Sequence, residues 1–322
     1  MKNNNILFLI DNLVVEIFVI GYPDKGESQI IFLTDRTNNS IIFSCVIDCY
    51  RHQNINKTIE VLKERNISIL DMFIWTHTDI DHSLGIVDLV TSYCNKKTNF
   101  ILPELVYGNL NDFIEYNNEI KESFDVINSF NTGTNYNVNS ATVVPNGHAS
   151  IWRNKFIDKD NGAELIFEIL AIAPCSALLR RRYGIGEINK KNDLSIATIF
   201  KIGQLNLLFS GDIENQTINQ IADYHFENLA YLKTPHHTST TSTNLIEKIK
   251  NNFNFKIPTA VTTVYKSNNL PHNDVVNEYK KITDNFYSTG IGNDYFGITY
   301  TKYHILSNSI TEEILTGNAI LL

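Results

Sequence analysis

Short apolar runs separated by polar turns predict a series of β-strands in the first part of the chain. The runs lie at residues 6–10, 14–20, 29–33 and 41–47 and are rich in β-branched and aromatic side chains. Such side chains are typical of strands. The last run ends at Asp48. We expect the four segments to be successive strands of one sheet.

The rest of the chain alternates between helical and strand-like patterns. Helices are predicted at residues 56–65, 83–93, 216–224, 243–250 and 273–282, and strands at residues 72–75, 141–144, 163–172, 194–202, 205–209, 260–264 and 297–305. Residues 103–131 are polar with helical spacing and predict a helical insertion. Strands that alternate with helices, with polar clusters at the strand ends, indicate a layered α/β protein.

Composition and charge narrow the class of protein. The 322 residues are 43% hydrophobic and 19% charged, with no repeat and no Gly/Ser-rich or Pro-rich linker. We therefore expect one domain over residues 1–322. The formal charge of −8 argues against a protein that coats nucleic acid non-specifically. An anionic substrate must be met by a local site.

The longest early apolar stretch, residues 6–22, contains Asp11, Asn12 and Glu16 and is too polar for a membrane span. It also lacks a basic leader and a small-residue cleavage site, which argues against a signal peptide. We expect a cytoplasmic protein without a membrane partner. The four cysteines form no CxxC pair and are interpreted as buried free thiols.

The segment from Trp75 to His82 concentrates candidate metal ligands. His77, Asp79, Asp81 and His82 follow an apolar strand within six residues. Two imidazoles and two carboxylates packed this closely require either a cation or full solvation. Two histidines are not typical of a solvated polar loop. The segment therefore predicts a metal site.

Two later strands end in groups that could complete this site. Ser210-Gly211-Asp212 follows the apolar run 205–209, and the glycine permits a tight turn. A lone Asp after a strand is also typical of a turn or a helix cap. The pair His236 and His237 follows the run 229–232 and Pro235. A pair of histidines after a strand is harder to explain as a turn.

The order of Asp48, HxDxDH at residues 77–82, SGD at 210–212 and PHH at 235–237 resembles the metallo-β-lactamase superfamily. Asp79 stands at the second His position of its HxHxDH motif, and this variant is similar to the ComEC/Rec2-type hydrolase domain of DNA-uptake proteins. Thr238 stands where that family usually has Gly. The resemblance implies an αβ/βα metallo-β-lactamase sandwich of two mixed sheets flanked by helices, with the site at one edge.

The resemblance also implies a ligand set. His77 and Asp79 would hold a first metal, Asp81, His82 and His237 a second, and Asp212 would bridge them. His236 would face the scissile phosphate, and the reverse assignment of His236 and His237 stays open. His148 is the candidate for the remaining first-metal ligand, although its turn equally suits a solvated histidine. The ions would be zinc or manganese, one or two per chain, because a carboxylate at Asp79 makes the first site harder.

The chemistry implied is hydrolysis by a metal-bound hydroxide without a covalent enzyme intermediate. The candidate catalytic residues are Asp81, His236 and His272. His236, or else His272, would protonate the leaving group. His272 equally suits a cap of the helix that starts near Asn273.

One basic cluster, Arg180, Arg181, Arg182 and Tyr183, stands in a Gly-containing segment and could bind phosphates and stack on a base. A solvated loop is an equal interpretation. We expect a phosphodiesterase, most simply a nuclease with DNA as its partner. A hydrolase of a small phosphodiester, lactone or phosphocholine ester is the alternative, with a di-iron redox protein or a non-catalytic binding protein less favoured. A homo-oligomer or a regulatory partner protein stays open.

Overall fold

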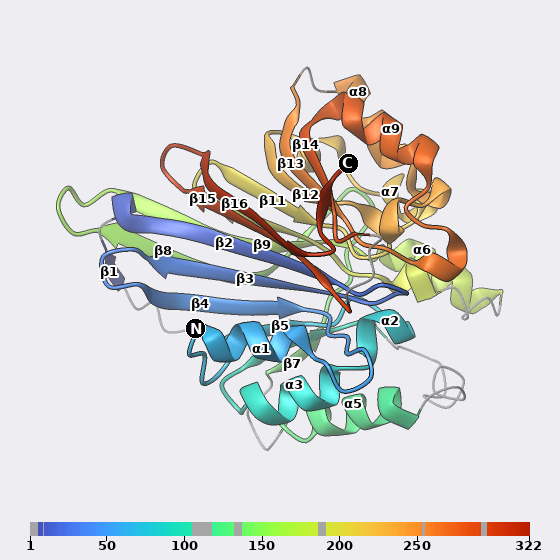
Figure 1. Cartoon of the computed structure of the whole chain (residues 1–322), viewed down its shortest axis with the longest axis horizontal. Coiled ribbons are helices and arrows are strands. Elements are labelled where there is room, and N and C mark those ends of the chain that lie inside the picture. The colour runs from blue at the N-terminus through green and yellow to red at the C-terminus, as the bar shows by residue number, and fades with distance from the viewer. Residues whose placement is uncertain are drawn as a thin grey trace.

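The computed structural model describes residues 6–8, 10–104, 118–131, 137–185, 191–252, 255–290 and 295–322. In these residues two β-sheets lie face to face, with helices on the outer side of each sheet (Figure 1). This arrangement confirms the predicted α/β sandwich of two mixed sheets.

One sheet carries most of the second half of the chain. Its strand order is β1 (Ile6–Phe8), β8 (Ala149–Asp158), β9 (Glu164–Ala173), β10 (Ala197–Ile202), β11 (Leu205–Phe209), β12 (Leu229–Lys233), β13 (Ile257–Thr262), β14 (Thr283–Ser288) and β17 (Ile320–Leu321). Strands β8 to β11 pair antiparallel, whereas β11 to β14 pair parallel.

The other sheet carries the first part of the chain and a later hairpin. Its order is β16 (Ser309–Gly317), β15 (Gly297–His304), β2 (Leu13–Gly21), β3 (Glu27–Asp35), β4 (Ser40–Ile47), β5 (Met72–Ile74), β6 (Asn99–Leu102) and β7 (Val138–Ser140). Strands β4 to β7 pair parallel and the others antiparallel.

Helices complete the layers on both sides. The sheet that contains β2 is covered by α1 (Lys57–Glu64), α2 (Ile80–Ser83), α3 (Ile86–Tyr93) and α5 (Asn118–Asn128), whereas α7 (Asn215–Ile218), α8 (Asn244–Asn252) and α9 (Asn273–Ile282) cover the other sheet (Figure 1). Helix α6 (Ser176–Gly184) follows β9. Short 3₁₀ turns are η1 (Ile10–Asn12), η2 (Lys191–Leu194), η3 (Asp223–Phe226), η4 (Pro235–Thr238), η5 (Thr240–Ser242) and η6 (Lys266–Asn268).

Burial on both faces explains why the central strands are continuous apolar runs. In β2, Val15 and Ile17 face the core between the two sheets, whereas Ile20 faces the core beneath α1 and α3. Helix α1 begins at an ordinary cap, because the side chain of Asn56 accepts a hydrogen bond of 3.2 Å from the backbone N–H of Ile59.

Several local predictions were wrong. Residues 141–144 form no strand, because only Val143 makes an isolated bridge, to Cys175. The segment with Arg180 is helical rather than a loop. The predicted helix 216–224 is divided between α7 and η3, since the chain turns between Asn219 and Ala222.

Other strands were missed because their exposed side chains hide the alternation. Strand β16 is an edge strand whose residues are mostly exposed, including Glu312 and Glu313. Strand β8 carries polar residues along most of its length. The strands β6, β7 and β17 have only two to four residues, and β14 begins with the polar residues Thr283, Asp284 and Asn285.

The predicted helical insertion is partly described. Residues 118–128 form α5, which packs against α3 and places Phe124 4.4 Å from Trp75 between ring centroids. Residues 105–117 lie outside the described residues. The described part of the insertion is therefore a member of the helix layer.

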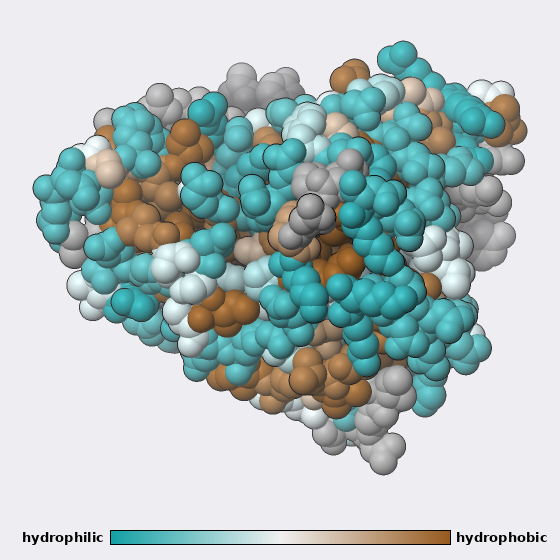
Figure 2. All heavy atoms as spheres, turned by 90° about the horizontal axis from the view of Figure 1, so that it is seen from above, coloured by the Kyte–Doolittle hydropathy of each residue, from teal (hydrophilic) through white to brown (hydrophobic). Residues whose placement is uncertain are grey.

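Polar side chains cover most of the face seen in Figure 2, and apolar ones gather there in a few patches. Among the described helices, none has the length and apolar character needed to cross a bilayer.

Candidate metal centre

Parallel strands from both sheets end at one edge of the sandwich, and the candidate ligands follow these ends. Asp48 follows β4, the segment from His77 to His82 follows β5, Asp212 follows β11, and the His236–His237 pair follows β12. Because the carboxyl ends of parallel strands meet at the same edge, residues far apart in the chain converge here.

His82 is oriented from behind by Asp48. Its Nδ1 lies 2.7 Å from Oδ2 of Asp48, and both residues are fully buried. Thr76 fixes that carboxylate by donating hydrogen bonds of 2.7 Å from its backbone N–H and from its hydroxyl. With Nδ1–H directed to a carboxylate, Nε2 of His82 presents its lone pair to the other side, as metal-ligating histidines do.

The turn after β12 places His237 in a strained backbone. His236, His237 and Thr238 all have positive φ, at 46°, 49° and 63°. Such conformations cost about 1–3 kcal/mol each for non-glycine residues and cluster at functional sites. The Thr238 hydroxyl is 2.8 Å from that of Thr262 and 2.9 Å from that of Thr234, which hold the turn in place. These contacts hold Thr238 in a backbone conformation that glycine adopts more readily.

The SGD turn needs its glycine. Gly211 has φ +51°, and a Cβ there would lie 2.5 Å from Oγ of Ser195. The same Ser195 oxygen accepts a 2.9 Å hydrogen bond from the backbone N–H of Asp212. The turn therefore directs the Asp212 carboxylate to the edge, as the sequence predicted.

Four side chains meet at short distances between the two sheets. Nε2 of His237 is 3.1 Å from Oδ2 of Asp81 and 3.6 Å from Oδ2 of Asp212. Nε2 of His82 is 3.5 Å from the same oxygens. All four side chains are buried. Two imidazole nitrogens and two carboxylate oxygens form a set that suits a divalent transition metal.

His77 and Asp79 lie beside this set. Nε2 of His77 is 3.5 Å from Oδ2 of Asp79 and 3.8 Å from Oδ2 of Asp212. Asp79 is partly exposed, and its Oδ1 lies 3.1 Å from Nζ of Lys191. The structure thus brings together six of the seven metal ligands proposed from the sequence, and their role as ligands stays a prediction.

Buried polar atoms without a partner mark the centre of the cluster. Nε2 of His77, Nε2 of His82 and Oδ1 of Asp212 have no hydrogen-bond partner among the described residues. An unpaired buried polar atom costs about 1–3 kcal/mol. Nε2 of His77 and Nε2 of His82 both face Oδ2 of Asp212, so a cation between them would satisfy both nitrogens, and the residues present fit a bound metal ion.

Glu27 is a functional residue that sequence reasoning missed. It is fully buried and groups by distance with His82, Asp212 and His237. Its oxygens, however, lie on the Nδ1 side of both imidazoles, 3.4 Å from His237 and 4.0 Å from His82. They are already bonded to Lys233 at 2.8 Å. We therefore assign Glu27 to the support behind the ligands.

A signal for Glu27 was present in the sequence. Lys233 ends an otherwise apolar strand directly before the PHH motif, and a buried lysine requires a carboxylate partner. The partner itself could not be chosen, because it lies on a strand of the other sheet.

The charges of the cluster perturb its titration. Burial alone would raise the pKa of Asp212, but the neighbouring His82 and His237 hold it well below its usual range. Burial would lower the pKa of His82, and the carboxylates of Asp212 and Asp48 instead hold it well above its usual range. The buried carboxylates therefore favour a positively charged group between them.

His148 is not brought to the cluster, so its expected role as a ligand is wrong for this arrangement. It is exposed, with Nδ1 3.4 Å from the Tyr224 hydroxyl and its ring 5.3 Å from that of His225. The turn before β8 is tied to the outer helix layer, where the backbone N–H of Asn146 donates to the carbonyl of Gln220.

His236 lines the pocket next to the cluster. Its Nδ1 is 3.0 Å from the Thr241 hydroxyl and 3.2 Å from Oε1 of Glu214, and its Nε2 is 3.4 Å from Nδ2 of Asn192. His272 is at the N-cap position of α9 and donates its backbone N–H to the carbonyl of Thr238. Its side chain makes no capping hydrogen bond, and its Nδ1 is buried without a partner among the described residues, so its catalytic role stays a prediction.

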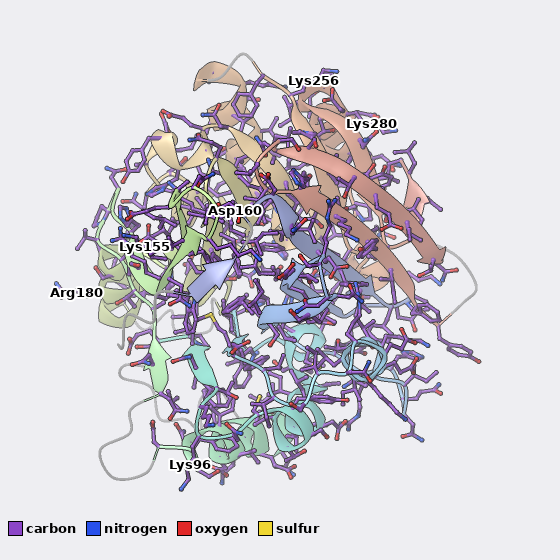
Figure 3. All side chains as sticks on the ribbon, turned by 90° about the vertical axis from the view of Figure 1, so that its left-hand side faces the viewer. Lys96, Lys155, Asp160, Arg180, Lys256 and Lys280 are labelled. Carbon is purple, nitrogen blue, oxygen red and sulfur yellow. The ribbon has the colours of Figure 1, made fainter. Side chains whose placement is uncertain are left out.

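The arginine cluster has two parts. Arg180 and Arg181 are exposed on α6, and Figure 3 shows Arg180 at the periphery of the molecule. Arg182 instead donates to Asp193 at 2.5 Å and to Gln216 at 2.9 Å. The side chain of Tyr183 lies outside the described residues.

No protein-family model and no curated protein matches the chain. Two solved structures align with most of it. A new diphosphatase from the PhnP family is 12% identical, covers 80% of this chain and 92% of its own, and has a TM-score of 0.36. A protein provisionally described as a metal-dependent hydrolase, from Parabacteroides distasonis, is 11% identical, covers 84% and 91%, and has a TM-score of 0.39. At these values the likenesses carry no argument about activity or substrate.

Proposed function

We propose that this chain is a metal-dependent hydrolase of the metallo-β-lactamase type that cleaves phosphodiesters, with DNA as the leading substrate. The observation that carries the proposal is that Nε2 of His77 and Nε2 of His82, both buried and without partners among the described residues, lie 3.8 and 3.5 Å from Oδ2 of Asp212. The order of the motifs along the chain supports the same assignment.

The ligands fall into two groups. Asp81, His82, Asp212 and His237 would hold one ion, and His77 and Asp79 would hold a second that shares Asp212. Divalent ions at such a site lower the pKa of bound water and neutralise the oxygens of a phosphate. Without His148, the second ion has fewer protein ligands. The site formed by Asp81, His82, Asp212 and His237 would therefore bind its ion more tightly.

The remaining side chains orient and transfer protons. Asp48 and Thr263 fix the imidazoles of His82 and His237 through their Nδ1 atoms, at 2.7 Å in both pairs. His236, held by Glu214 and Thr241, is the group we assign to protonate the leaving oxygen. No covalent intermediate is part of the proposal.

A panel of substrates tests this proposal. Purified protein with added manganese or zinc is expected to degrade single-stranded or linear DNA, and Asp212→Ala is expected to abolish degradation. Failure to cleave DNA, RNA and small phosphodiesters with either metal would contradict the proposal.

A small phosphodiester is the second candidate, because the pocket at the cluster has a volume of about 210 Å³. Sites that enclose drug-sized ligands occupy about 300–1,000 Å³. Replacing Arg180 and Arg181 by Gln separates the two candidates. Weaker DNA cleavage with unchanged turnover of bis(para-nitrophenyl) phosphate would assign these arginines to a polymer, whereas turnover restricted to small diesters would favour the second candidate.

A further inference from the structure

The pocket at the candidate metal centre combines an acidic floor with cationic side chains. Asp79, Asp81 and Asp212 line it, and so do Lys25 and Lys191. Tyr265, Asn268 and His236 add neutral or titratable groups. Lys25 was not a candidate from the sequence, where the basic cluster of the α6 segment, which Lys191 follows, was expected to meet the substrate.

Lys25 is carried by a hairpin turn whose shape is fixed. The turn joins β2 to β3, and the backbone N–H of Tyr22 donates to the carbonyl of Gly26 at 3.3 Å. Gly26 has φ +104°, and a Cβ there would lie 2.1 Å from the ring of Tyr50. Only glycine allows this close approach. The position of Lys25 is therefore built into the fold.

The hairpin turn is also tied to the opposite wall of the pocket. The backbone N–H of Lys266 donates to the carbonyl of Asp24 at 2.7 Å. This bond joins the turn to the segment that carries Tyr265 and Asn268. The ring of Tyr265 in turn lies 5.4 Å from that of His237. The wall thus holds Lys25 in a defined relation to the ligands.

The two lysines differ in their partners. Lys191 lies 3.1 Å from Asp79, and the next residue, Asn192, contacts His236. Lys25 is half-buried and makes no ion pair with a carboxylate in the described part of the chain. A half-buried ammonium without a carboxylate, beside an acidic metal cluster, is a group available to an anionic ligand.

We infer that Lys25, with Lys191, forms an anion subsite that binds the phosphate oxygens of the substrate. A phosphate anion that approaches three carboxylates needs positive charge beyond that of the metal ions, whereas a neutral ester or lactone does not. The subsite therefore selects phosphate esters over neutral esters and lactones. This inference rests on the proposed function, because it names the substrate class of the same site.

The test compares Lys25→Met with Lys96→Met, a control at an exposed lysine at the periphery of the molecule that does not line the pocket (Figure 3). Binding of inorganic phosphate to the metal-loaded protein is measured by calorimetry, and metal content is measured for each variant. A hydrogen bond to a charged group contributes enough for about a tenfold loss of phosphate affinity in Lys25→Met. Lys25→Arg should restore binding, and the control should equal the wild type.

Kinetics add a second readout. Lys25→Met should raise KM for bis(para-nitrophenyl) phosphate by about tenfold with little change in kcat. Lys191→Met should weaken phosphate binding in the same direction. The metal content of Lys191→Met shows whether the loss of the contact with Asp79 also weakens metal binding.

The outcomes separate the two proposals. Unchanged phosphate affinity and KM in Lys25→Met, with an active wild type, would overturn the subsite and leave the hydrolase intact. A wild type that binds phosphate through Lys25 but cleaves no ester would overturn the proposed function and leave the subsite.

Discussion

Nδ1 of His237 lies 2.7 Å from the hydroxyl oxygen of Thr263. That hydroxyl donates its hydrogen to Glu27, which is paired with Lys233 in a fully buried ion pair. The Thr263 oxygen must then accept from Nδ1–H of His237, so that Nε2 is the nitrogen that faces Asp81, at 3.1 Å, and Asp212, at 3.6 Å. A buried ion pair thus determines which nitrogen of His237 can bind a metal.

Replacing Thr263 by Val keeps the shape of this side chain and removes its hydroxyl. Loss of a partner behind a metal-bound histidine typically reduces metal affinity by about 10–100-fold. We expect this loss in a competition titration with a chromophoric chelator. Thr263→Ser should retain near wild-type affinity, and equal affinities for Val and Ser would show that Thr263 does not orient His237.

His148→Ala should leave metal content and affinity unchanged, because His148 contacts Tyr224 and His225 instead of the cluster. Metal analysis after gel filtration checks this. His82→Ala, which removes a buried nitrogen from the centre of the cluster, is the matched comparison and should lower the metal content. A loss of metal in His148→Ala would restore it as a ligand.

The motifs predicted the site because of how parallel strands end. The order of the motifs resembles the metallo-β-lactamase superfamily, and this resemblance placed Asp48, His82, Asp212 and His237 together; in the structure each follows an apolar strand that ends at the same edge. Supporting groups were not accessible in this way. Glu27 begins β3 of the other sheet and reaches His237 only because the two sheets face each other, whereas Thr263 follows β13, the neighbour of β12 in the same sheet.

His148 shows the converse limit. A histidine between two motifs fitted the expected order. The order of residues along the chain does not say, however, whether the turn that carries His148 lies at the cluster or against the helix layer. The hydrogen bond from Asn146 to Gln220 binds that turn to the outer helix layer. The pairing of Arg182 with Asp193 could not be predicted for the same reason, because a run of basic residues does not indicate which carboxylate each of them contacts.

His225 predicts a pH dependence of stability outside the metal centre. It is buried, and burial together with the nearby His148 lowers its pKa to about 4. The folded protein therefore binds a proton less readily than the unfolded chain, whose histidines titrate near 6.5. This contribution to stability is present above about pH 6.5 and is lost as the pH falls towards 4.

Thermal unfolding of His225→Phe measures this effect. The melting temperature of the wild type should fall between pH 7 and pH 4.5 by more than that of the variant. Parallel pH profiles for the two proteins would exclude His225 as a source of acid destabilisation.

The arginines of α6 should differ in their effect on stability. Arg182→Leu leaves the carboxylate of Asp193, which is 3% exposed, without its guanidinium. Removal of one partner of a buried pair costs about 3 kcal/mol. Arg180→Gln, at an exposed position, should change the free energy of unfolding by less than about 0.5 kcal/mol. Urea unfolding of both variants measures the difference, and similar losses would contradict a structural role for Arg182.

Metal content per chain, measured by mass spectrometry after gel filtration for the wild type and for Asp212→Asn, is the most direct test that these ligands hold a cation. Asparagine keeps the size of the side chain and removes its charge. The wild type is predicted to retain one or two divalent ions per chain, and Asp212→Asn to retain far less while remaining folded. A wild type that binds no ion, or a variant that binds as many ions as the wild type, would contradict the assignment of a metal centre.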